Sequence, residues 1–251
     1  MLGITLETFG STNQSGYDLT PNFGIARGDF QHLSHINKFG FNSAVGSTFE
    51  TIWDGSSVYS YPATAGTVQI TSSDGASDNG GTVQVVGLDS NYANASETLT
   101  IGGARGTTQF IRVFRMIMLT ANTGTTNVGT ITATHTQSDS TDTTVAQITP
   151  GVSQTLMTNY TVPAGYSAYI VRFYATVDVK DKQATIIGVA RPSGVGAFQT
   201  KAYFTSNGNT VDYKYEVPLK FPEKTDFEVR AKSPTGVGLT ATYDIILEQN
   251  T

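Results

Sequence analysis

Short runs that alternate apolar and polar residues constrain the fold of this chain more than any other feature. Residues 67–71 and 82–86 both have a period of two, as a strand with one buried face does. The residues between them, 72–81, are rich in Gly, Asp, Ser and Asn, which favour turns. Similar runs recur to residue 248, and no amphipathic segment has the length of a helix. We therefore expect an all-β protein, built as an antiparallel β-sandwich or jelly roll.

The chain divides into an N-terminal arm and one or two β modules. Residues 1–34 contain turn signals but little periodicity, so they are expected to form an extended arm. Turn-forming residues near 150 suggest a boundary between a β-rich module at 35–150 and a β-sandwich module at 151–251. A single sandwich with a long hairpin fits the same pattern.

Charge and composition exclude several classes of function. The chain has 15 basic and 20 acidic residues, a net charge of −5, and scattered basic residues, which argues against nucleic acid as its ligand. It has no cysteine, so disulfides and thiolate metal sites are absent. The first residues lack the pattern of a signal peptide, and the longest apolar stretch, 110–119, is interrupted by two arginines. We expect no membrane span.

Groups of residues that could perform chemistry are sparse. His32, His35 and His135 could bind a metal, but nothing near them in sequence suggests a rigid ligand frame. Residues 74–80 are rich in oxygen ligands but lack the spacing of a calcium-binding loop. Glu216 and Glu228 are available as acids, yet nothing in the sequence places them across a cleft. We expect a protein that is not an enzyme and that has no catalytic residue, metal or cofactor.

Aromatic residues are the remaining signal. Residues 1–55 lack a periodicity of their own but contain eight large aromatic side chains, which we expect to pack on neighbouring subunits or, alternatively, on the protein's own core. These candidate interface residues are Phe9, Tyr17, Phe23, Phe30, Phe39, Phe41, Phe49 and Trp53. Three tyrosines could stack on sugars at the surface or fill the core: Tyr59, Tyr61 and Tyr92.

Three stretches resemble a family of virion structural proteins of tailed bacteriophages from marine and environmental sources, over roughly residues 35–248. The first is Lys38-Phe39-Gly40 with Asn42, followed by Glu50-Thr51-Ile52-Trp53-Asp54-Gly55. The second is Val86-Gly87-Leu88-Asp89 with Tyr92, leading to Ser96-Glu97-Thr98-Leu99-Thr100-Ile101-Gly102-Gly103. The third is Tyr160-Thr161-Val162-Pro163-Ala164-Gly165-Tyr166-Ser167-Ala168-Tyr169, with Glu216-Val217-Pro218-Leu219 and Pro222-Glu223-Lys224-Thr225-Asp226 after it.

The resemblance implies a non-enzymatic component of a virion, assembled in the cytoplasm of a bacterial host. Its partners would be other capsid or tail subunits and further copies of itself. Our first expectation is a decoration or cement protein that stabilises the head through subunit contacts. The alternative within the particle is a tail- or fibre-associated protein that contacts host surface glycans. From another class, a free carbohydrate-binding module or glycan-cleaving enzyme stays open.

Overall fold

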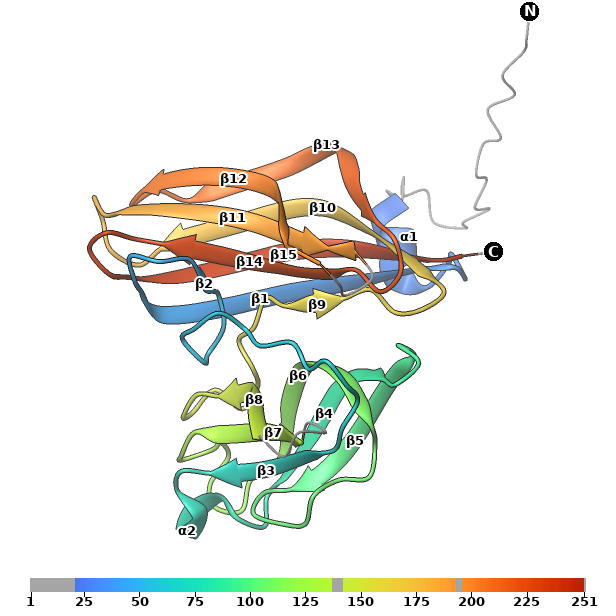
Figure 1. Ribbon diagram of the computed structural model, residues 1–251, viewed down its shortest axis with the longest axis vertical. Helices are drawn as coiled ribbons and strands as arrows, with labels where there is room; N and C mark the ends of the chain where they lie inside the picture. The colour runs from blue at the N-terminus through green and yellow to red at the C-terminus, as the bar shows by residue number, and fades with distance from the viewer. Residues whose placement is uncertain (1–20, 137–141, 193–195, 251) are drawn as a thin grey trace, which may run out of the picture.

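A computed structural model describes residues 21–136, 142–192 and 196–250 of the chain, and over these residues it is an all-β protein. Fifteen strands and two short helices form two antiparallel β-sandwiches, drawn one above the other in Figure 1. The expected fold class is confirmed. Neither described helix has the length or the apolar character needed to cross a bilayer.

The first sandwich contains both ends of the described chain. Its first sheet has the strand order β1 (Leu33–Val45), β15 (Val237–Gln249), β10 (Tyr166–Val177) and β13 (Val211–Phe221). Its second sheet has the order β12 (Gln199–Asn207), β11 (Gln183–Arg191), β14 (Asp226–Lys232) and β2 (Glu50–Thr51), and β9 (Tyr160–Thr161) also pairs with β14.

The second sandwich is inserted between β2 and β9, and we call it the inserted sandwich. One of its sheets has the order β3 (Val68–Ser72), β7 (Ile131–Thr136) and β8 (Asp142–Ile148). The other has the order β5 (Asn94–Thr100), β4 (Thr82–Asp89) and β6 (Phe110–Thr120). The two helices are α1 (Pro21–Arg27), before β1, and α2 (Gly75–Asp78), between β3 and β4.

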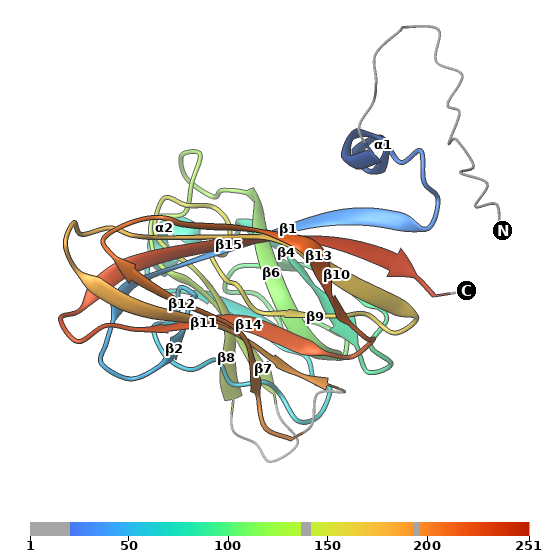
Figure 2. The same ribbon diagram turned by 90° about the horizontal axis from the view of Figure 1, so that it is seen from above.

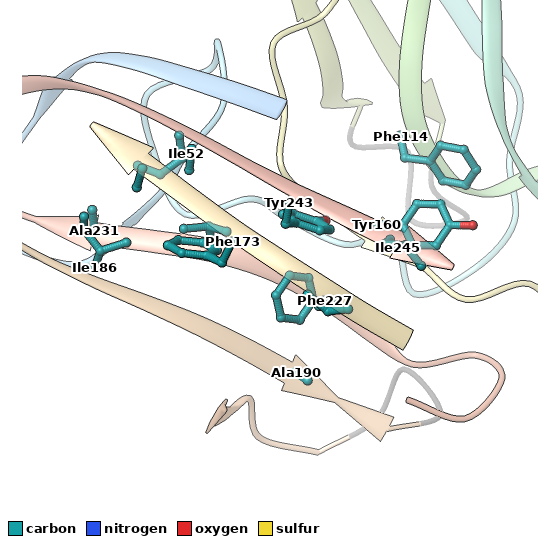
Figure 3. Close-up of a cluster of buried hydrophobic side chains, with 14 of the residues drawn as sticks. Ile52, Phe114, Tyr160, Phe173, Ile186, Ala190, Phe227, Ala231, Tyr243 and Ile245 are labelled. Atoms are coloured by element: carbon teal, nitrogen blue, oxygen red, sulfur yellow. The ribbon is translucent and has the colours of Figure 1, made fainter. Parts of the chain in front are cut away.

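Alternation of side chains explains why these runs form sandwiches. On β15, Leu239, Ala241, Tyr243 and Ile245 are buried, and the residues between them are partly exposed. Figure 3 shows Tyr243 and Ile245 pointing into a cluster with side chains of the opposite sheet, such as Phe227. A second apolar cluster fills the inserted sandwich. Each sandwich therefore has its own core.

The expected boundary near residue 150 does not separate the two sandwiches. Strand β1 was expected in the first module, but it pairs with β15 along its length, from Leu33 opposite Glu248 to Val45 opposite Val237. The first sandwich is therefore discontinuous in sequence, and residues 58–157 form most of the insertion. The period of a strand shows which face is buried but not which strand is its partner, so the local pattern could not reveal this pairing.

The two chain segments that lead into and out of the inserted sandwich lie side by side. The Ile52 carbonyl accepts a hydrogen bond from the Thr158 amide (3.0 Å), and Trp53 forms an isolated bridge with Met157. The Asp54 carboxylate accepts a hydrogen bond from the Leu156 amide (2.9 Å). Because the insertion leaves and returns at one place, it adds a second core without interrupting a sheet of the first.

The arm expected at residues 1–34 is described only from residue 21 onward. Helix α1 lies beyond the end of the first sandwich and continues into β1 (Figure 2). Within this segment Phe30 packs against Gly24, since a Cβ atom at Gly24 would lie 2.7 Å from the Phe30 ring. Helix α1 is thus stabilised partly by its own segment.

Candidate functional site

The two sandwiches meet at a largely buried group of five charged side chains and one tyrosine, which we call the junction network: Arg112, Arg191, Asp226, Glu228, Arg230 and Tyr61. At its centre is Asp226, which is fully buried at the start of β14. Arg112, from the inserted sandwich, donates to both Asp226 carboxylate oxygens, at 2.8 and 3.0 Å. Arg191 donates to the same carboxylate at 2.6 Å. One carboxylate therefore joins a strand of each sandwich.

Glu228 occupies the next position on the same face of β14. It is also fully buried, it accepts a hydrogen bond from the Tyr61 hydroxyl (3.1 Å), and it forms an ion pair with Arg230. Burial raises the pKa of Glu228, while the charge of Arg230 acts in the opposite direction. The guanidinium groups of Arg112 and Arg191 lie over the Tyr61 ring, at 5.2 and 5.1 Å from its centroid. These carboxylates are held by cations and a hydroxyl, which favours a structural role.

A pocket opens beside the junction network, and we call it the junction pocket. It has a volume of about 360 Å³ and is lined by residues of β1, β4, β5, β6 and β9. These residues are Ile36, Lys38, Val86, Asn94, Ala95, Ser96, Phe114, Arg115 and Tyr160. Figure 3 shows Phe114 and Tyr160 next to each other, and their ring centroids are 5.0 Å apart. The lining includes two cations and no acid.

Lys38 is the unusual residue of this pocket. Its side chain is 2% exposed, and its Nζ donates to the Phe114 carbonyl at 2.5 Å. Burial lowers the pKa of Lys38 well below its usual value, and the nearby charge of Arg115 lowers it further. Arg115 is held at the rim by a hydrogen bond to the Asn37 carbonyl (2.9 Å). A buried amine beside a second cation is a site that an anion would stabilise.

A third feature lies at the edge of the first sandwich formed by β12 and β13, and we call it the aromatic edge: Tyr203, Phe204, Tyr213, Tyr215 and Val217. Both strands are edge strands in the described sheets, and Figure 1 draws them on the side away from the inserted sandwich. Tyr203 is 65% exposed, Tyr213 is 46% exposed and Val217 is 81% exposed. Tyr213 also contacts Phe204 and Tyr215, with ring centroids 5.7 and 4.8 Å apart.

The aromatic edge is irregular. Between the pairs of Ile170 with Leu219 and of Arg172 with Lys214, residues 215–218 bulge out of β13. A bulge that contains Pro218 opposes the addition of another strand along this edge. A partner would therefore contact the protruding side chains rather than extend the sheet.

The eight aromatic residues predicted to contact other subunits have different environments. Phe9 and Tyr17 lie outside the described residues. Phe23 is 50% exposed on α1, and Phe30 packs near it. Phe39 and Phe41 are half-buried on β1, and Phe49 lies under the Lys232 ammonium group. Trp53 is 3% exposed within its own chain.

Trp53 therefore fills the protein's own core, which corrects its assignment to a subunit interface. Its ring packs edge-on against Tyr59, with centroids 5.1 Å apart, and its indole N–H donates to the Ser57 carbonyl. The aromatic residues of 1–55 were expected to pack on neighbouring subunits or on the protein's own core, and for Trp53 the second alternative holds.

The predicted sugar-contacting tyrosines are also largely covered. Tyr59 is 3% exposed, and its hydroxyl donates to the Val113 carbonyl, so it is a core residue rather than a surface contact. Tyr61 belongs to the junction network. Tyr92 is partly buried and lies under Arg112 and Lys224. Cations lie over the rings of Tyr61 and Tyr92, on faces that a sugar would stack on.

The candidate metal ligands do not come together. His135 is buried against the Phe110 carbonyl, and the His35 ring bonds the Asp244 carboxylate. In the oxygen-rich loop, Asp74 caps α2, and the buried Asp78 accepts hydrogen bonds from the amides of Val128 and Gly129. Within residues 21–136, 142–192 and 196–250, no three His, Asp or Glu side chains gather as a metal site.

The sequence did not reveal that Lys38 and the charged face of β14 are buried. Asp226, Glu228 and Arg230 alternate with apolar residues, which is the pattern of a solvated strand face, and only the covering sandwich makes that face buried. Lys38 lies in the first of the three stretches that resemble virion proteins, but nothing in the sequence of that stretch indicates that this lysine is buried. Comparison with models of protein families and with curated proteins finds no match to this chain.

Proposed function

We propose that this protein is a non-enzymatic structural subunit of a tailed-phage particle, in the first place a decoration protein of the head. The observation that carries the proposal is the aromatic edge, where Tyr203, Tyr213 and Val217 are 65%, 46% and 81% exposed on the two edge strands of the first sandwich. Exposed aromatic residues of this kind commonly anchor protein interfaces. The resemblance of residues 35–248 to virion structural proteins supports the same proposal.

The build of the chain suits this role. Two cores are joined by a buried ionic network, so the subunit can bear load as one unit. Only 14% of its residues are charged, which limits repulsion between copies that pack closely on a shell. The bulge in β13 prevents open-ended strand addition, so contacts through the aromatic edge would be specific.

The test is to purify particles from a culture infected with the phage that encodes this chain and to quantify the chain by mass spectrometry. A copy number comparable to that of the major shell protein would support the decoration role, and a far lower one would favour the tail or a fibre. Absence of the chain from purified particles would overturn the proposal.

A double variant, compared with a control variant, tests whether the aromatic edge contacts the particle. Tyr213→Ser combined with Val217→Ser removes two protruding side chains and should abolish incorporation while leaving the circular dichroism spectrum unchanged. The control is Leu119→Ser, which removes a 52% exposed side chain from the inserted sandwich. Equal incorporation of both variants would exclude the aromatic edge as the contact.

A further inference from the structure

We propose that the junction pocket binds a small organic carboxylate with an apolar body, whose charge pairs with Lys38 and Arg115. This inference concerns a different surface from the aromatic edge and does not depend on the proposed function. It starts from an imbalance of charge, because the lining contains two cations and no acid.

The first step concerns the hydrogen bonds of Lys38. An ammonium group has three N–H donors, and Lys38 uses one of them for the Phe114 carbonyl. No other described residue accepts a hydrogen bond from it. A buried, incompletely paired amine is costly, and a carboxylate oxygen would accept a charge-assisted hydrogen bond from it.

The second step concerns the second cation. Arg115 lines the same pocket from β6 and is half-buried, with one guanidinium nitrogen bonded to the Asn37 carbonyl. A guanidinium group has five N–H donors, so others remain for a ligand. Lys38 comes from the first sandwich and Arg115 from the inserted one, so a bound anion would connect the two.

The third step identifies the ligand class. Ile36, Val86, Ala95, Phe114 and Tyr160 give the pocket mostly apolar walls, and Asn94 and Ser96 add polar groups at exposed positions. Inorganic phosphate would satisfy the cations but leave these walls in contact with water. A ring or short alkyl chain attached to a carboxylate satisfies both, and a volume of about 360 Å³ suits a ligand of that size.

Binding should be linked to protonation of Lys38. The charged or titratable groups that face Lys38 are Arg115 on β6, Tyr160 on β9 and Tyr243, its cross-strand neighbour on β15. None of these groups is a carboxylate. Because burial lowers the pKa of Lys38, an anion placed beside it raises that pKa again and favours uptake of a proton. Affinity should therefore fall as the pH rises through the Lys38 pKa.

The test is isothermal titration calorimetry of the full chain with benzoate, benzamide and inorganic phosphate. We expect benzoate to bind at least about tenfold more tightly than benzamide, its neutral isostere, because the charge-assisted bonds are lost. Phosphate should bind more weakly than benzoate. Repeating the benzoate titration in two buffers of different ionisation enthalpy measures the proton uptake.

Variants of Lys38 and Arg115 test whether benzoate binds in the junction pocket. Lys38→Met and Arg115→Gln should each weaken benzoate binding at least about tenfold, and Lys38→Met should remove the proton uptake. Lys220→Met is the matched control, since Lys220 is an exposed lysine near the Tyr169 ring on a different strand. Equal binding of benzoate and benzamide to the unmodified protein overturns the proposal without any variant. Unchanged affinity in Arg115→Gln also overturns it.

Discussion

Asp226→Asn is the sharpest test of how the two sandwiches are held together. The substitution keeps the shape of the side chain but replaces one oxygen by an NH₂ group. Each Asp226 oxygen accepts a hydrogen bond from a guanidinium group: Oδ1 from Arg112, and Oδ2 from both Arg112 and Arg191. Whichever oxygen is replaced, N–H donors then face one another, and Arg112 and Arg191 lose the anion that they share.

The expected loss of stability in Asp226→Asn follows from the burial of the ion pairs that Asp226 forms. The Asp226 side chain is fully buried, and the side chains of Arg112 and Arg191 are 4% and 18% exposed. Removing one partner of a buried ion pair costs about 3–5 kcal/mol. With a urea m value of about 3 kcal/mol/M for a chain of this size, the unfolding midpoint should fall by about 1–1.7 M.

The assay is urea unfolding followed by far-UV circular dichroism and by the fluorescence of Trp53, the single tryptophan of the chain. Trp53 lies where the chain enters the inserted sandwich, so it reports on the junction. The matched control is Asp212→Asn. Asp212 receives two hydrogen bonds from Arg172, but these side chains are 47% and 53% exposed, so water screens the ion pair and its loss should shift the unfolding midpoint far less than Asp226→Asn does. Similar midpoint shifts for the two variants would refute the reasoning.

Two further predictions concern the linkers and the N-terminal segment. Burial raises the pKa of Asp54 to about 6, so the folded state binds more protons than the unfolded state and stability should fall as the pH rises from about 4 to about 6. Asp54→Asn should remove that fall in thermal unfolding curves, and parallel pH profiles would contradict the assignment. Removing residues 1–32 should leave the melting temperature nearly unchanged, because β1 begins at Leu33. Removing residues 1–45 deletes one of the two strands that pair with β15, which exposes an edge of β15 and should give aggregated protein, as size-exclusion chromatography would report.

Local features of the sequence predicted the strands well. The alternating runs at 67–71 and 82–86 correspond to β3 and β4. The all-β class follows from these because the period of two is a property of each strand alone.

Properties that depend on distant segments could not be predicted in this way. The pairing of β1 with β15 joins residues more than 200 positions apart, such as Leu33 and Glu248. The burial of Asp226 depends on Arg112 of the inserted sandwich, and the burial of Lys38 depends on Phe114. The junction network and the junction pocket arise where the two sandwiches meet, and no single segment of sequence contains that contact.

The pairing of the first strand with the last has a consequence for synthesis on the ribosome. Strand β1 is translated before the inserted sandwich, whereas its partner β15 is translated only after the whole inserted sandwich has been made and has been free to fold. During that interval β1 has an unpaired edge and risks pairing with a neighbouring nascent chain. Its polar residues Ser34, His35, Asn37 and Lys38 lower that risk, since polar and charged positions interrupt aggregation-prone strands. In the finished protein Lys38 is buried, so a residue that protects the nascent strand later becomes part of the junction pocket.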